Sequence, residues 1–177
     1  MKMEVETELQ SLKGRSLLAM VRSGGMLQLE FAAPHDGPPG GNGVGAAVRY
    51  ALHVSCAWRL TSADGILTGS GDYFTPADPD ADPDGFDWEE AGGNWCDVRL
   101  EALMNAVAAE PLTVTSTVAD DLGGVWLSLS GDLTLVVFPD SSHTEHVETE
   151  FWRLIMPGNN GPHFVVSSAG AERIMEA

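Results

Sequence analysis

The sequence predicts an α+β fold that is mainly antiparallel sheet with two short helices. Three observations lead to this prediction. Short stretches of alternating apolar and polar residues are separated by glycine and proline turns, which is typical of antiparallel strands. Two other stretches have apolar residues at helical spacing. The sequence Trp-Arg-Leu also occurs once in each half of the chain, at 58–60 and at 152–154.

The first half of the sequence predicts one helix followed by strands. Val5, Leu9 and Leu12 share one helical face, so we expect a helix over about 4–13 that ends before Gly14. Residues 16–21 and 27–31 predict a hairpin around Gly24-Gly25, with one face in water. Residues 34–45 are too rich in proline and glycine for a regular element, and one long strand over 46–60 and another over 66–70 follow.

The second half repeats this order of elements. Asp97 is expected to cap a helix in which Leu100, Leu103, Met104 and Val107 have helical spacing. Strands at 112–118, 125–130 and 133–138 should form a meander, the last two joined by a two-residue turn at 131–132. Strands around 152 and over 163–168 complete the pattern.

The order of elements predicts an internal duplication of a helix plus β-meander unit. In each half a helix precedes a hairpin with glycine at its turn, a proline loop, a Trp-Arg-Leu strand and a final strand. The halves, 4–71 and 98–170, would be joined by an acidic loop over 72–97 within a single domain, 1–177. Trp58 and Trp152 should then face one core, with Arg59 and Arg153 on the opposite faces of their strands. The alternative is a coincidence of common strand and turn chemistry.

The charge of the chain is negative and unevenly distributed. The formal net charge is -17, and residues 72–97 carry nine acids and no basic residue. Such a surface repels phosphate backbones, so we expect no direct binding to nucleic acid. A basic protein or a cation is the better electrostatic partner, although acidity also serves solubility.

The sequence also predicts a cytoplasmic protein without a membrane-spanning segment. The first residues lack the apolar core of a signal peptide, and no apolar run approaches the length needed to cross a bilayer. Cys56 and Cys96 have no motif spacing between them. We therefore expect free, buried thiols and not a disulfide or a metal pair.

Asp80, Asp82, Asp84 and Gly85 match the opening of a calcium loop, in which alternate carboxylates surround the ion. The twelfth position is Ala91, where such loops have a bidentate glutamate. The sequence therefore predicts a solvated loop that binds Ca²⁺ at most weakly, and no other cofactor.

The histidines do not form a catalytic or metal-binding pattern. His143 and His146 could share a metal with nearby glutamates only on a helix, whereas we expect a loop entering a strand with an exposed acidic edge. The contiguous residues 140–143, Asp-Ser-Ser-His, do not build a catalytic triad, whose members come from distant segments. His53 and His163 are expected as sheet residues and not as general bases.

The chain resembles a group of small uncharacterised bacterial proteins of unknown function. The resemblance covers residues 46–170 and is carried by the segments 56–60 (Cys-Ala-Trp-Arg-Leu), 69–73 (Gly-Ser-Gly-Asp-Tyr), 138–142 (Phe-Pro-Asp-Ser-Ser), 152–154 (Trp-Arg-Leu) and 163–166 (His-Phe-Val-Val). Some similar small acidic proteins are candidate toxin-immunity proteins, which implies a basic toxin as a partner. The resemblance implies no catalytic residues, and the loops at 34–45 and 78–84 depart from the group's pattern.

Two functions from different classes remain. The first is a non-enzymatic protein-binding module that docks a basic partner. Its candidate binding residues are Trp58, Arg59, Tyr73, Trp152, Arg153 and His163. The second is a small-molecule or metal-dependent enzyme with its site in a cleft between the halves, lined by the same tryptophans and Tyr73 with His53 or His163. The sequence leaves the oligomeric state and the identity of the partner open.

Overall fold

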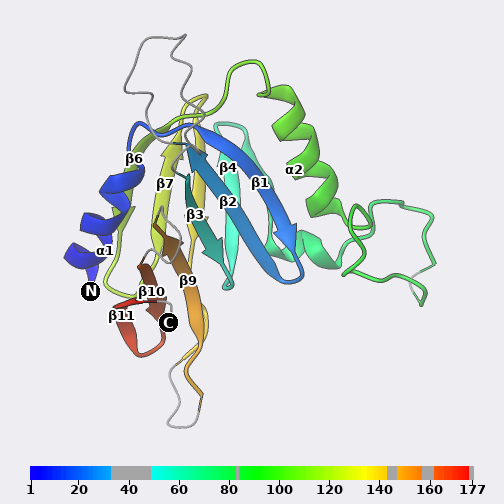
Figure 1. Cartoon of the computed structure of the whole chain (residues 1–177). Coiled ribbons are helices and arrows are strands. Elements are labelled where there is room, and N and C mark those ends of the chain that lie inside the picture. Colours follow the sequence, from blue (N-terminus) through cyan, green and yellow to red (C-terminus); the bar gives the residue numbers. More distant parts are fainter. Residues whose placement is uncertain (33–48, 83, 143–146, 157–161, 176–177) are drawn as a thin grey trace.

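Two antiparallel β-sheets enclose one hydrophobic core in the computed structural model, which describes residues 1–32, 49–82, 84–142, 147–156 and 162–175 (Figure 1). The first sheet has the order β1 (Leu17–Ser23), β2 (Met26–Ala32), β3 (Arg49–Val54), β9 (Glu150–Ile155), β10 (His163–Ser167) and β11 (Gly170–Ile174). The second has the order β5 (Gly65–Gly69), β4 (Trp58–Ser62), β8 (Leu133–Val137), β7 (Val125–Leu129) and β6 (Val114–Ala119). The predicted α+β fold, mainly antiparallel sheet with two helices, is confirmed.

The two α-helices lie on opposite sides of the sheets. Figure 1 shows α1 (Lys2–Leu9) beside β6 and α2 (Trp95–Ala106) beside β1. Glu8 of α1 forms an ion pair with Arg173 of β11, so α1 joins the edges of both sheets. A 3₁₀ helix, η1 (Gln10–Leu12), extends α1, and another, η2 (Ser70–Phe74), follows β5 and packs against α2. Among the described residues, no helix has the length and apolar character needed to cross a membrane.

The two halves of the chain exchange strands. β1, β2 and β3 of the first half share a sheet with β9 and β10, whereas β6, β7 and β8 of the second half share a sheet with β4 and β5. If β1 to β5 are matched in order with β6 to β10, each sheet has the strand order of the other. Only β11 has no counterpart in this match.

The ladders have the same register in both sheets. Trp58 lies opposite Val137, the last residue of β8, and Trp152 lies opposite Val54, the last residue of β3. Two residues further on, rows of buried leucines cross both sheets: 60, 135 and 127 in one, and 154, 52 and 29 in the other. This correspondence of order and register supports the duplication, which itself stays a prediction.

Two predictions in the first half were wrong in detail. The single strand expected over 46–60 is two strands, β3 and β4, in different sheets, and residues 33–48 lie outside the described ranges. The chain crosses between the sheets at 55–57, where the N–H groups of Ser55 and Cys56 both donate to the carbonyl of Phe151. The sequence also matched the Gly24-Gly25 hairpin with the one at Gly131, whereas strand order matches β1–β2 with β6–β7.

Other local predictions can be compared directly. The turn at 131–132 is confirmed, since both Gly131 and Asp132 have positive φ, as this two-residue hairpin turn requires. The N-cap of α2 was wrong by three residues, because Asn94 is the cap and its Oδ1 accepts from the Asp97 N–H at 3.0 Å. β11 was not predicted.

Candidate functional site

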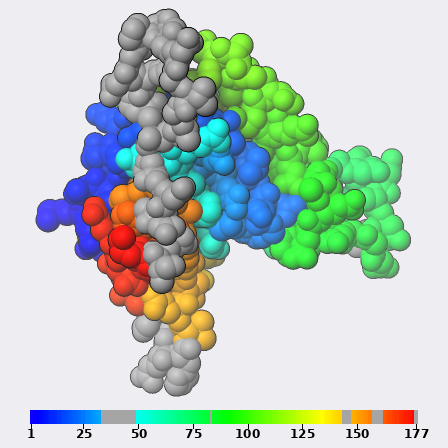
Figure 2. Space-filling view, in the orientation of Figure 1, coloured from blue at the N-terminus to red at the C-terminus, as the bar shows by residue number. Residues whose placement is uncertain are grey.

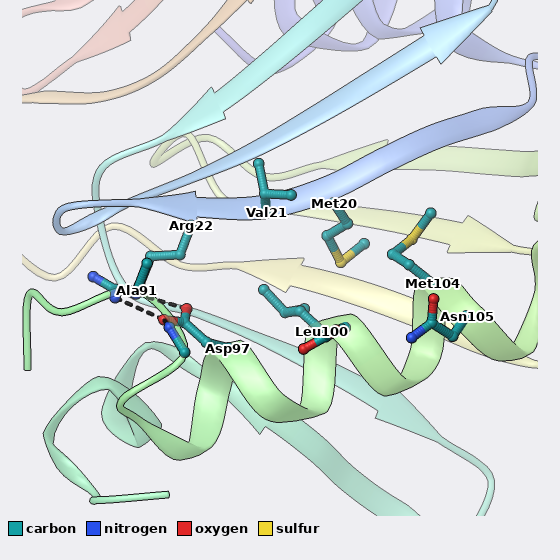
Figure 3. Close-up of a pocket in the computed structure, with 10 residues that line it drawn as sticks. Met20, Val21, Arg22, Ala91, Asp97, Leu100, Met104 and Asn105 are labelled. Carbon is teal, nitrogen blue, oxygen red and sulfur yellow. Dashed lines mark hydrogen bonds and ion pairs between the residues drawn. The ribbon is translucent and has the colours of Figure 1, made fainter.

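A groove runs between β1 and α2, and Figure 3 shows the side chains that border it. Its volume is about 280 Å³. The lining residues come from β1, from α2 and from the end of the preceding loop: Met20, Val21, Arg22, Ala91, Gly92, Asp97, Leu100, Glu101, Met104 and Asn105. The part between strand and helix is mainly apolar, because Met20 and Leu100 are buried there and Met104 is half-buried. We call this feature the β1–α2 groove.

A buried ion pair closes one end of the β1–α2 groove. Arg22 Nε and Nη2 donate to the two carboxylate oxygens of Asp97, each at 2.8 Å (Figure 3). The side chains are 2% and 14% exposed. Burial by itself would raise the pKa of Asp97, but the hydrogen bonds from Arg22 and from the Gly92 N–H outweigh it, and the pKa lies below its ordinary value. The same bond, with Asp97 as its acceptor, raises the pKa of Arg22. Both groups are therefore charged at neutral pH.

The acidic segment projects from this end of the molecule. We call residues 77–91 the acidic loop; it holds seven exposed carboxylates and no basic residue, and Figure 2 shows it (green) standing out from the body. Its backbone is folded into successive turns, in which Asp78, Asp82 and Asp87 each accept a hydrogen bond from the N–H two residues later. The other four acids are Asp80, Asp84, Glu89 and Glu90.

The base of the acidic loop is held on both sides. Ala77 N donates to Gly93 O at 2.9 Å, and Trp95 N donates to Thr75 O at 2.8 Å. Arg22 reaches it as well, since Nη2 donates to Glu90 O at 3.3 Å. The loop therefore projects from a fixed base that adjoins the β1–α2 groove.

Aromatic rings flank the loop base next to a second cleft of about 320 Å³. The Phe74 ring, 64% exposed, lies 5.4 Å from the ring of Trp88. Cys56 borders this cleft, and burial together with the charge of Asp140 raises the pKa of its thiol to about 12. A thiol with this pKa is protonated at neutral pH and is a poor nucleophile. The described residues that line this cleft include no histidine.

The two predicted core tryptophans are indeed buried. Trp58 is 1% exposed and its Nε1 donates to the hydroxyl of Tyr73 at 2.8 Å. Trp152 is 0% exposed and its Nε1 donates to the carbonyl of Gly123 at 2.8 Å. Tyr73 is 3% exposed, and burial raises its pKa. All three were candidate binding residues. Trp58 and Trp152 lie in the core, whereas Tyr73, although buried, also borders the second cleft.

The two arginines that follow the tryptophans lie on outer faces, as predicted. Arg59 is exposed, with its guanidinium carbon 5.6 Å from the centre of the Phe138 ring. Arg153 pairs with Glu150, because a bulge in β9 puts Glu150 on the outer face. The neighbouring Glu148 accepts a hydrogen bond from the Ser167 hydroxyl at 2.7 Å.

His53, Arg153 and His163 form a polar cluster on the outer face of the first sheet. Arg153 lies directly opposite His53, and its Nη1 is 3.4 Å from His163 Nδ1. Burial, and then the nearby Arg153, lowers the pKa of His53 below its ordinary value of 6.5. His163 is 8% exposed. Neither histidine lines the two clefts described above.

The calcium prediction remains untested. Asp80, Asp82 and Asp84 are exposed, and Asp82 already holds a turn by accepting from the Asp84 N–H at 3.1 Å. In the ranges that the structure describes, no three His, Cys, Asp or Glu side chains are grouped to hold a metal ion. His143 and His146 lie outside these ranges. Cys56 and Cys96 are free thiols, Cys96 buried and Cys56 half-buried.

Sequence reasoning missed the residues that shape the β1–α2 groove. Arg22 occupies an inward position of a largely apolar strand, between Met20 and the hairpin turn. A cation at such a position needs a buried acid, and the acid-rich segment before α2 could supply it. An inward arginine on an apolar strand, together with an acid-rich segment elsewhere in the chain, is the sequence feature that could have indicated the Arg22–Asp97 pair.

Comparisons with known proteins identify no relative. No family model matches the chain, and neither the curated proteins nor the solved structures contain a significant match to it.

Proposed function

We propose that this protein is a non-enzymatic binding module that docks a basic protein through the acidic loop. The observation that carries this proposal is the projection of seven exposed carboxylates, with no basic residue among them, from a base fixed by the Arg22–Asp97 pair. A concentrated negative potential of this kind steers a cationic partner and fixes its orientation. A basic toxin is the most concrete partner, in line with the resemblance to candidate immunity proteins.

The alternative, an enzyme with a cleft between the halves, has less support. Trp58 and Trp152, its expected lining, are core residues. The half-buried thiol of Cys56 is protonated at neutral pH because its pKa is about 12. The observations on the acidic loop therefore favour binding over catalysis.

The proposal can be tested with two variants of equal charge. In the first, the four loop acids whose carboxylates hold no turn are neutralised: Asp80→Asn, Asp84→Asn, Glu89→Gln and Glu90→Gln. In the control, four exposed acids elsewhere are neutralised: Asp64→Asn, Glu110→Gln, Asp132→Asn and Glu172→Gln. Each variant has a net charge four units less negative than the native chain.

Binding of a fluorescent lysine- and arginine-rich peptide is measured by anisotropy at low and moderate salt. Since exposed charge pairs contribute about 0.2–1 kcal/mol each, we expect the loop variant to bind about tenfold more weakly and the control to change by less than about threefold. Equal weakening in both variants would show that the loop has no special role, and the proposal would then be wrong.

A further inference from the structure

The β1–α2 groove has the size and lining of a site for one apolar side chain. Met20, Leu100 and Met104 supply its apolar wall. Its volume of about 280 Å³ is smaller than the roughly 300–1,000 Å³ of sites that hold drug-sized molecules. Methionine side chains are unbranched and adaptable, so such a wall can fit different aliphatic or aromatic groups.

The charged residues of the β1–α2 groove do not call for a charged group inside it. Arg22 and Asp97 neutralise each other through two hydrogen bonds of 2.8 Å. Glu101 lies on the rim, is exposed, and forms no ion pair within the described part of the chain. Ala91, the last residue of the acidic loop, and Gly92 form the adjoining wall, so the acidic loop begins directly at this side of the groove. The groove therefore favours a ligand that places an apolar group inside it and positive charges at its rim.

We infer that the β1–α2 groove receives a single bulky apolar side chain, such as Leu, Met or Phe, from a basic segment of the partner, whose flanking Lys and Arg residues face Glu101 and the acidic loop. This inference rests on the proposed function and specifies the partner's chemistry. It follows the general anatomy of protein interfaces, in which an apolar anchor fills a pocket and a charged rim surrounds it.

The test compares two peptides that differ at one position. Both have the same lysines and arginines, and the central residue is Leu in one and Ala in the other. We expect the Leu peptide to bind the native protein at least about tenfold more tightly than the Ala peptide, because truncating an anchor residue in a pocket has an effect of this size.

Two variants on α2 test the location of the anchor. Met104→Gln replaces an apolar wall residue by a polar one of similar length, and Leu103→Gln makes a comparable change at a half-buried neighbour that does not line the groove. The preference for Leu over Ala should fall below about twofold in Met104→Gln and persist in Leu103→Gln. Urea melts establish that both variants are folded.

A measurement on the native protein does not depend on variants. With ¹³C-labelled methionine methyl groups, the Leu peptide should shift the resonances of Met20 and Met104, and the Ala peptide should not. Equal affinity for both peptides with retained dependence on the loop acids would overturn the groove inference alone. Failure of both peptides to bind, or binding that is independent of the loop acids, would overturn the proposed function with it.

Discussion

Each buried tryptophan combines apolar burial with one satisfied N–H group. The partner of Trp58 is the Tyr73 hydroxyl, and that of Trp152 is the carbonyl of Gly123. Gly123 has φ of +89°, and a side chain there would meet Val166 Cγ1 at 2.8 Å. The Trp152 ring therefore depends on a backbone position where glycine is favoured.

Replacing either buried tryptophan by alanine should destabilise the protein strongly. We expect Trp58→Ala and Trp152→Ala each to lower the free energy of unfolding by about 3–5 kcal/mol, because each leaves a cavity and an unpaired polar group. Trp126, which is 40% exposed, is the control, and Trp126→Ala should cost less than about 1 kcal/mol. Urea melts measure all three. A small effect at one buried tryptophan and a large one at the other would contradict the equivalence of their strand positions.

Alternation along a strand is the part of this arrangement that sequence could predict. Neighbouring residues of a strand point to opposite faces. The sequence therefore correctly placed Trp58 and Trp152 on the core face and Arg59 and Arg153 on the outer face. The bulge before Trp152 was not predictable, because it depends on how β9 pairs with β10. That bulge decides which glutamate meets Arg153.

At the scale of elements, one ion pair joins a strand, a helix and a loop. Arg22 on β1 binds Asp97 in the first turn of α2 and the carbonyl of Glu90 in the acidic loop. Asp97 also accepts from Gly92 N and from Asn94 Nδ2. The position of α2 and the base of the loop therefore share the same bonds.

Removal of either partner should destabilise the protein because the other charge is left buried. We expect Arg22→Met and Asp97→Asn each to lower the free energy of unfolding by about 3 kcal/mol, and the double variant to lose less than the sum. The Asp97→Asn difference should be constant above the ordinary Asp pKa of 3.8 and shrink as pH falls below it, because the folded pKa is lower still. Denaturant melts between pH 3 and pH 7 measure it. Strictly additive losses would contradict a direct pair.

Sequence patterns located most elements but not the sheet in which each lies. Apolar alternation continues through the crossover at 55–57, so β3 and β4 looked like one strand. Asp97 has the chemistry of an N-cap, but the buried Asn94 takes that role and leaves Asp97 for Arg22. All five residues of β11 are exposed or half-buried, so the strand lacks an apolar signal. Its pairing with β10 defines it instead.

At the scale of the whole molecule, the halves are interlocked by exchanged strands. β3 of the first half pairs with β9 of the second, and β4 pairs with β8. α1 packs on β6, and α2 on β1, so each helix also covers the other half's strands. The acidic loop lies within the link between the halves, residues 72–97, and contributes to none of these strand pairings.

Cutting the acidic loop should therefore leave the two halves associated. We expect a chain in which residues 80–85 are replaced by a protease recognition sequence to be cleaved there in its folded state. Its fragments should co-elute in gel filtration at neutral pH and separate only in denaturant, because the exchanged strands hold them together. An uncut sample in the same buffers is the control. Separation of the fragments without denaturant would contradict the interlocked arrangement.

The exchange of strands between the halves also means that paired strands are translated at different times. One edge of β4 pairs with β5, which follows it directly, but on the other edge Trp58 pairs with Val137 of β8, which is translated 79 residues later. At about 5–20 residues per second, this second edge of β4 waits roughly 4–16 seconds for β8. Unpaired strand edges promote association between nascent chains. The acidic loop leaves the ribosome within this interval, and its negative charge would keep neighbouring unfinished chains apart until the second half closes both sheets.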